Sequence, residues 1–157
     1  MNQIVFRESH WRLLEHYMTQ RTDVESGAYA VFKTSRIDKS QKLLVTEILI
    51  PEAKDYLKRT SVRVAFTPEF TEKAFRKCEL NRGHLLDIHN HPWSNEVNFS
   101  PIDDHEAEHT KIPYVNKYVP DIMIAFLVFG ESMVTAKSRS WDKPRSRMSD
   151  VCKIVVV

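Results

Sequence analysis

The segment DIMIAFLVFG, residues 121–130, is the feature that most restricts the fold of this chain. It is almost continuously apolar, yet it is far shorter than the roughly 20 residues that a membrane-spanning helix needs. A run of this kind is typical of a central β-strand that is buried on both faces. We therefore expect a sheet in which other strands lie beside this segment and helices pack against its faces.

Strand patterns and helix patterns alternate along the rest of the chain. Ser9 is the expected N-cap of a first helix, Thr67 is the expected N-cap of a second, and a third opens at Ser100-Pro101 and should end by Ile112, because Pro113 follows. Strands are expected at residues 3–6, 28–34, 42–50, 61–66, 84–91, 121–130 and 133–141, and residues 152–157 form a last strand or a sticky tail. This intermixing predicts an α+β protein, an α/β/α sandwich in which helices flank a mixed β-sheet.

Length and composition narrow the class of protein. A chain of 157 residues is expected to form one domain, residues 1–157. Its 23 basic and 21 acidic residues nearly balance, so neither nucleic acid nor an anionic membrane is required as a partner. Only Cys78 and Cys152 occur, outside any CxxC pattern, and the N-terminal sequence has no signal-peptide pattern. We therefore expect a protein of the reducing cytoplasm.

Two zinc-binding signatures overlap in the segment of residues 87–109. In the first, HExxH, His105 and His109 are four residues apart and would face one ion from a helix, beside Glu106. The surrounding sequence DDHEAEHTK is charged on nearly every side, and burying unpaired charges is costly. Pro113 then leaves no downstream turn for a third ligand. We therefore expect these two histidines on the solvated face of a short amphipathic helix.

The second signature, HxH, joins His89 and His91. Residues two apart on a strand share a face, so both imidazoles can approach one ion from the end of the strand. Ser100 and Asp103 follow at the start of the next helix, where Asp103 is stabilised by the helix dipole and suits a third ligand. Two imidazoles and one carboxylate leave a fourth tetrahedral position for water, as in a catalytic zinc site. On spacing alone, surface histidines beside a helix cap are an equally good interpretation.

Glu25 favours the HxH interpretation. It lies in the segment DVESGAYAVF, at the N-terminal start of the first long expected strand and two residues before Gly27. From there a carboxylate could reach a zinc-bound water without ligating the metal. The alternative is a loop glutamate on the surface, which is the usual position of an isolated Glu.

Three motifs taken together resemble the JAMM signature of the JAB/MPN metalloprotease family: ESGA at residues 25–28, HNHP at residues 89–92 and SPID at residues 100–103. The order of elements agrees with this family over nearly the whole chain, and within the family the chain resembles the prokaryotic stand-alone, deubiquitinase-like branch. The resemblance therefore implies the JAB/MPN fold, with a curled mixed sheet flanked by helices.

The resemblance also implies roles for individual residues. One zinc ion per chain would be held by His89, His91 and Asp103, and its bound water would have a pKa of about 7. Glu25 would act first as general base and then as general acid. The Ser100 hydroxyl, together with zinc, would stabilise charge on the carbonyl oxygen.

The loop from residue 92 to residue 99 is one residue longer than the usual form of the family. The carboxylate ligand is therefore Asp103 or its neighbour Asp104. Asp87 would orient His89 from the same strand face, unless it is an exposed strand carboxylate.

The activity implied by the resemblance is hydrolysis of the amide bond after the C-terminus of a ubiquitin-like modifier, in deconjugation or precursor processing. Activating and conjugating enzymes of the same pathway would be partners. Trp93, Phe99 and residues 111–120 are apolar and close enough to the ligands to line a groove for an extended tail, although local packing also explains them.

Three other functions are compatible with parts of the pattern. A RadC-like protein linked with DNA repair shares the HNHP motif, but a Gly would be expected soon after Pro92, where this chain has Trp93-Ser94. A non-catalytic MPN scaffold usually lacks one of the ligands. A zinc deaminase needs a PCxxC motif, which this sequence does not contain.

Overall fold

The structure is a computed structural model that describes residues 3–94, 97–133, 136–142, 147–151 and 153–157. The strands are β1 (Gln3–Phe6), β2 (Gly27–Ile37), β3 (Ser40–Leu49), β4 (Tyr56–Arg59), β5 (Val64–Phe66), β6 (His84–Asn90), β7 (Ile124–Phe129), β8 (Ala136–Asp142), β9 (Arg147–Val151) and β10 (Lys153–Val156). The helices are α1 (Glu8–Met18), the 3₁₀ turn η1 (Ala53–Asp55), α2 (Pro68–Leu80), α3 (Pro101–Glu106), the π-helical turn η2 (Ala107–Lys111) and α4 (Ile112–Tyr118).

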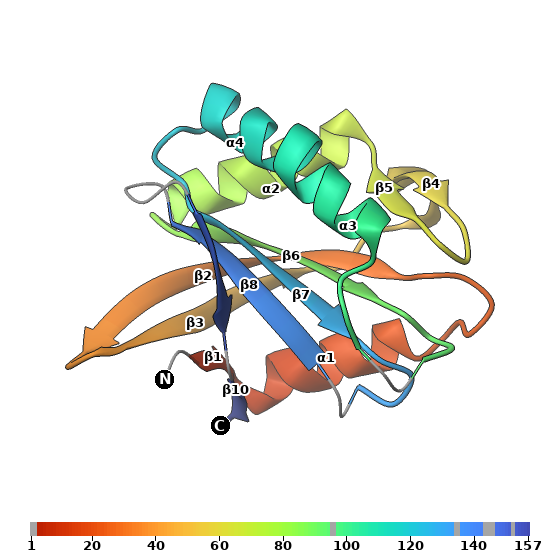
Figure 1. Cartoon of the computed structure of the whole chain (residues 1–157), viewed down its shortest axis with the longest axis horizontal. Coiled ribbons are helices and arrows are strands. Elements are labelled where there is room, and N and C mark those ends of the chain that lie inside the picture. Colours follow the sequence, from red (N-terminus) through yellow and green to blue (C-terminus); the bar gives the residue numbers. More distant parts are fainter. Residues whose placement is uncertain (1–2, 95–96, 134–135, 143–146, 152) are drawn as a thin grey trace.

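Eight strands form one mixed, curled sheet in the order β10-β1-β3-β2-β6-β7-β8-β9 (Figure 1). Every residue of β7 is buried, and β7 lies between β6, which is parallel to it, and β8, which is antiparallel. The predicted central strand is therefore confirmed. Within the described residues, no helix is both long and apolar enough to span a membrane.

Helices cover both faces of the sheet (Figure 1). On one face, Leu14 and Met18 of α1 pack into a core that includes Leu86 and Ile88 of β6. On the other face, α2 and the α3-η2-α4 segment enclose a second core around Phe126 of β7. The predicted α+β architecture, with a mixed sheet between helices, is confirmed at this level.

The third helix continues past Pro113, so its predicted end by Ile112 is wrong. The π-helical turn η2 directly precedes the proline, and the Ile112 N–H bonds to the Ala107 carbonyl, five residues back. Widening the helix by one residue per turn relieves the clash between a proline ring and the preceding carbonyls and tolerates its missing N–H. The chain then continues as α4 to Tyr118.

Two further differences arise from contacts between distant segments. The N-cap of α1 is Arg7 rather than Ser9, and the Glu8 N–H donates to the Val157 carbonyl at 2.8 Å. The Val157 carbonyl therefore accepts a hydrogen bond from the first N–H of α1. This contact is possible because β10 pairs in parallel with β1 and brings the two segments together. Cys78 is buried, and Cys152 lies outside the described residues.

The strand expected at residues 61–66 is shorter than predicted and lies outside the main sheet. The strand observed there, β5, pairs with β4, which was not predicted, and the two form a two-stranded sheet at one end of α2 (Figure 1). β9 is a further strand that was not predicted, because its sequence RMSDV has little apolar alternation.

Candidate metal centre

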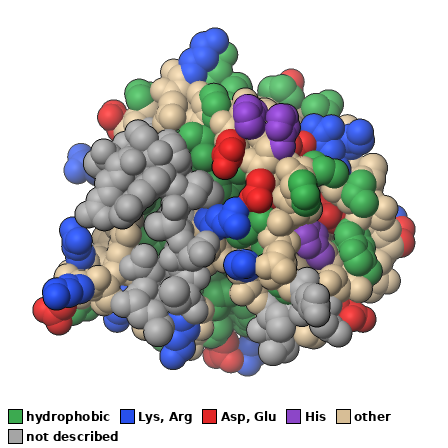
Figure 2. All heavy atoms as spheres, viewed as in Figure 1, with side chains coloured by type: hydrophobic (Ala, Val, Ile, Leu, Met, Phe, Trp, Pro, Cys, Tyr) green, Lys and Arg blue, Asp and Glu red, His purple; other side chains and the backbone are tan. Residues whose placement is uncertain are grey.

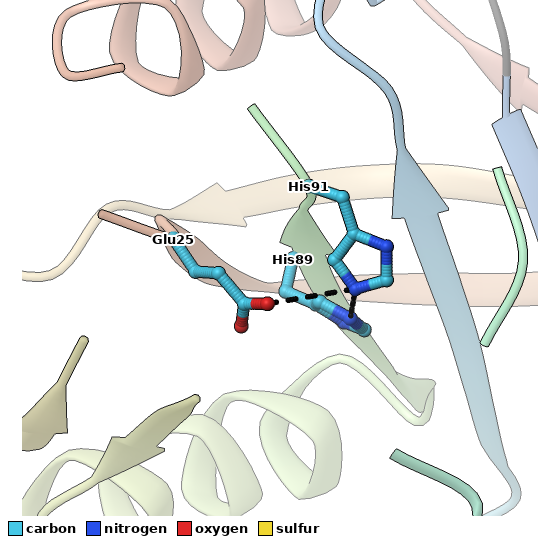
Figure 3. A group of neighbouring side chains, drawn as sticks. All are labelled: Glu25, His89 and His91. Atoms are coloured by element: carbon cyan, nitrogen blue, oxygen red, sulfur yellow. Dashed lines mark hydrogen bonds and ion pairs between the residues drawn. The ribbon is translucent and has the colours of Figure 1, made fainter. Parts of the chain in front are cut away.

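The strand β6 brings His89 and His91 to the edge of the sheet. His89 faces the same side as Asp87, whereas Leu86 and Ile88 point into the α1 core, as the period of two requires. Both imidazoles are buried, with exposed fractions of 8% each. Pro92 follows at once and, as expected, no strand continues beyond it. The two rings therefore project together from the end of one strand (Figure 3).

Glu25 reaches this pair from the start of β2 (Figure 3). It is only 2% exposed, and its Oε1 lies 3.5 Å from Nε2 of His91. Its backbone is held by the β4–β5 hairpin: the Glu25 N–H donates to the Thr60 carbonyl at 2.9 Å, and Arg59 donates to the Glu25 carbonyl at 3.1 Å. The interpretation as a surface glutamate is therefore wrong.

Asn90, which lies between the two histidines, was not singled out from the sequence. Its side-chain oxygen accepts the Ser26 N–H at 2.7 Å, and its amide donates to the Met18 carbonyl at 3.0 Å. This buried side chain ties the Glu25 segment and the end of α1 to the histidine strand. The only available signal was a polar residue on the core-facing side of a buried strand end.

We predict that Asn90→Ala lowers the free energy of unfolding by about 3 kcal/mol, because it leaves a buried N–H and a buried carbonyl without their partner. For a domain of this size the melting temperature should fall by about 5–10 °C, measured by thermal unfolding. Asn98→Ala is the control, since Asn98 is exposed. Equal melting temperatures for the two variants would contradict this role.

The carboxylate of Asp103 lies against both histidines. Its Oδ2 is 3.3 Å from Nε2 of His89 and 3.3 Å from Nε2 of His91. The same oxygen accepts the Ser100 N–H at 2.7 Å, and the Asp103 N–H donates to the Ser100 hydroxyl at 3.1 Å. This capping box fixes the carboxylate in the first turn of α3. Asp104 instead pairs with Arg139 at 2.5 Å.

Three nitrogen and oxygen atoms thus form a nearly equilateral triangle, because Nε2 of His89 and Nε2 of His91 are also 3.3 Å apart. Charge-assisted hydrogen bonds are shorter, about 2.7–2.9 Å. Ligands about 2.0–2.1 Å from a tetrahedral zinc ion, however, lie about 3.3 Å from each other. The donor set and its spacing therefore fit a metal ion held by His89, His91 and Asp103.

Glu25 is also within reach of the same ion. The ligand atoms of Glu25, His89 and His91 all lie within 4.8 Å of one another, and all three residues are buried. This group could hold a metal ion. The Asp103 oxygen is equidistant from both imidazoles at 3.3 Å, whereas the Glu25 oxygen lies 3.5 Å from Nε2 of His91.

The two carboxylates at the centre have opposite electrostatics. Burial alone would raise the pKa of Asp103, but the close contacts of its carboxylate with the imidazoles of His89 and His91 outweigh burial and lower the pKa well below its usual value. Burial, together with the nearby charge of Asp103, raises the pKa of Glu25 from 4.5 to about 8, although Lys111 opposes the shift. One carboxylate is therefore a stable anion, and the other accepts and releases protons near neutral pH.

We predict that Glu25→Gln stabilises the metal-free protein at neutral and alkaline pH. Because the folded-state pKa of Glu25 is raised, the folded protein binds the proton more tightly than the unfolded chain, so stability falls as pH rises from 4.5 to about 8. The Gln variant cannot ionise at this position, so its stability does not fall in this way. Its free energy of unfolding should exceed that of the wild type by about 3 kcal/mol at pH 7 and by almost nothing at pH 4.5.

Denaturant unfolding at several pH values, with a chelator present, measures this difference. A bound cation favours the ionised carboxylate, so the gain should shrink when metal is added. A gain in stability that is the same at every pH would contradict the raised pKa.

Trp93 and Phe99 flank the two histidines. The ring of Trp93, which is 50% exposed, stacks on His91 with centroids 5.9 Å apart. Phe99 is half-buried, with its centroid 6.4 Å from that of His89. Both aromatic residues therefore border the metal centre, and residues 95 and 96 of the loop between them lie outside the described residues.

Asp87 is not the exposed strand carboxylate that was the alternative interpretation. It is 3% exposed, and its carboxylate forms an ion pair with Lys111 at 2.8 Å. Lys111 is the last residue of the π-helical turn η2. A π-helical turn is not predicted by this sequence, so the pairing of Lys111 with Asp87 could not be expected from the pattern of residues.

His105 and His109 lie apart from this centre, as expected. Both are exposed, and their rings stack on each other with centroids 4.3 Å apart. Figure 2 shows neighbouring histidine side chains on the outer surface of the helix layer. Neither histidine belongs to the group of Glu25, His89 and His91, in which all three side chains are buried and close enough to hold a metal ion.

Comparison with known proteins supports the fold and gives no function. No family model and no curated protein matches the sequence. A similar solved structure is the solution structure of a structural-genomics protein from Desulfitobacterium hafniense, with a TM-score of 0.57 and 13% sequence identity, covering 100% of this chain and 93% of that chain. At this identity the likeness concerns the arrangement of helices and strands alone.

Proposed function

We propose that this protein is a zinc-dependent peptidase of the JAB/MPN (JAMM) type that hydrolyses the amide bond after the C-terminus of a ubiquitin-like modifier. The observation that carries the proposal is the triangle of His89, His91 and Asp103, with edges of 3.3 Å, beside the buried carboxylate of Glu25. If these three residues hold zinc, a fourth coordination position would remain for water, as is typical of catalytic rather than structural zinc.

Zinc, when bound, supplies Lewis acidity that makes water a nucleophile near neutral pH. Glu25 would take the proton from the attacking water, since its buried carboxylate lies 3.5 Å from Nε2 of His91. The same group then returns the proton to the leaving amine. The raised pKa of Glu25 belongs to the metal-free protein, and a bound cation would lower it, so that the carboxylate would be ionised before attack.

The Ser100 hydroxyl is the candidate donor to the carbonyl oxygen. Its oxygen accepts the Asp103 N–H at 3.1 Å, which leaves the O–H proton for donation. Removing one such donor from an oxyanion site typically costs about 3 kcal/mol of transition-state stabilisation. The capping box thus gives Ser100 two tasks, orienting Asp103 through the backbone and presenting its hydroxyl to substrate.

The substrate proposed here is a ubiquitin-like protein or its conjugates, and activating and conjugating enzymes of the same pathway are proposed partners. Trp93 and Phe99 support a substrate channel, because both rings border the ligand histidines. An extended C-terminal tail would lie between them and reach the open metal position.

Cleavage of fusions between ubiquitin-like proteins and a reporter tests this proposal. Zinc-loaded protein should release the reporter, a chelator should stop the release, and added zinc should restore it. Fusions that stay intact under all conditions, with stoichiometric zinc in the protein, would contradict the peptidase and favour a non-catalytic scaffold. Salt-sensitive DNA binding without cleavage would instead favour the RadC-like alternative.

A further inference from the structure

An apolar cavity of about 310 Å³ lies between α2 and α4, beneath the β4–β5 hairpin. Its walls are mainly carbon atoms of aromatic and aliphatic side chains, among them Tyr29, Phe66, Phe75, Tyr114, Val115 and Ile124. This volume is at the lower end of the roughly 300–1,000 Å³ typical of small-molecule pockets. It suits one bulky side chain rather than a whole cofactor.

The cavity adjoins the metal centre. A smaller hollow is lined by Glu25, His89 and Asp103, and it shares Tyr29 and Asp87 with the wall of the cavity. On the sheet, Gly27 pairs with His89 and Tyr29 pairs with Asp87. The cavity is therefore two residues along β6 from a metal ligand, about 7 Å, and on the same face of the sheet.

The charged groups that line the cavity are paired with each other. Asp87 and Lys111 lie 2.8 Å apart, and Arg63 and Glu106 lie 2.5 Å apart. The hydroxyl groups of Tyr29 and Thr71 likewise form a hydrogen bond with each other, at 2.9 Å. Among the described residues that line it, the cavity thus has balanced charge, which disfavours a charged occupant.

We propose that this cavity is a specificity pocket that takes a bulky apolar side chain of the substrate, one or two residues from the hydrolysed amide. One extended residue spans about 3.4 Å, so a chain whose amide reaches the metal centre places a side chain about 7 Å away over the cavity. The inference rests on the proposed function for the identity of the cleaved bond. The chemical class of the bound side chain rests on the cavity alone.

Binding is tested first, in the metal-free and zinc-loaded protein, with N-acetyl-phenylalanine amide and N-acetyl-glycine amide as probes. In NMR titrations the phenylalanine amide should shift signals of cavity residues such as Thr71 and Tyr114, and the glycine amide should not. Thr71→Phe and Thr110→Phe, which fill the cavity from two different helices, should each abolish these shifts. Lys73→Phe adds the same ring to an exposed position of α2 and should change nothing.

Selectivity is tested next, with a peptide library in which each position is varied and products are identified by mass spectrometry. Wild-type protein should prefer Leu, Met, Phe or Tyr at one fixed position within two residues of the cleaved bond, by about 10–100-fold over Gly. Thr71→Phe and Thr110→Phe should lose this preference, so that each variant cleaves its Leu-, Met-, Phe- and Tyr-containing peptides no faster than its Gly-containing peptides, whereas Lys73→Phe should keep the wild-type preference.

Each outcome decides between the two proposals. Probe binding in the cavity without any hydrolysis supports the ligand class and contradicts the proposed function. Hydrolysis without probe binding, or with the same preference in wild type and both filled variants, overturns the specificity pocket and leaves the peptidase standing.

Discussion

Glu25→Gln should retain stoichiometric zinc while kcat for cleavage of a modifier fusion falls by about 10²–10⁴-fold. The reason is geometric: the Glu25 carboxylate lies 3.5 Å from Nε2 of His91, while the His89, His91 and Asp103 atoms form their own triangle. Gln keeps the shape of the side chain and removes its ability to accept a proton. Metal analysis and a cleavage assay on the same preparation measure both effects.

Glu106→Gln is the matched control, since this glutamate borders the same hollow but pairs with Arg63. It should keep both zinc and most of the activity. Loss of zinc in Glu25→Gln would show that Glu25 is a ligand, and full activity in that variant would remove it from the mechanism.

The second large effect concerns the metal itself. Replacing His89 or His91 with Ala, or Asp103 with Asn, should weaken zinc binding by at least about 100-fold, because loss of a direct ligand exceeds the roughly 10–100-fold cost of losing an outer partner. Titration with a competing chelator measures the affinity. The hydrolytic activity should fall in parallel in all three variants.

Two sets of control variants match these substitutions. The double variant His105→Ala with His109→Ala should bind zinc as the wild type does, because both imidazoles are exposed on the helix surface. Asp104→Asn should also bind normally, since Asp104 pairs with Arg139. Equal affinities in Asp103→Asn and Asp104→Asn would exclude Asp103 as a ligand, and loss of zinc in the histidine double variant would favour the HExxH interpretation.

Local sequence patterns predicted strand faces and helix starts correctly where the contacts that fix them are between residues near in sequence. The period of two placed His89 on one face of β6 and Leu86 and Ile88 on the other, as the structure has them. The capping signals at Thr67 and Ser100 also correspond to real helix starts. Each of these features depends on a few neighbouring residues, so the sequence carries them directly.

Predictions from the sequence were wrong where contacts with distant segments outweigh the local conformational preference. Ser9 is a good N-cap by composition, but the pairing of β10 with β1 brings the Val157 carbonyl to the Glu8 N–H and moves the helix start. Pro113 is a helix breaker by composition, yet the packing of Ala107, Ile112 and Val115 into the second core carries the helix through it. Burial of an apolar face outweighs one missing hydrogen bond.

Two histidines on one strand face and a carboxylate in the first turn of a capped helix can be identified from the amino-acid sequence without a structure. The burial of Glu25 beside them, the pairing of Lys111 with Asp87 and the apolar cavity next to the centre depend on how the chain folds. Burial and charge pairing arise where surfaces from distant segments meet, and no local pattern specifies which surfaces those are.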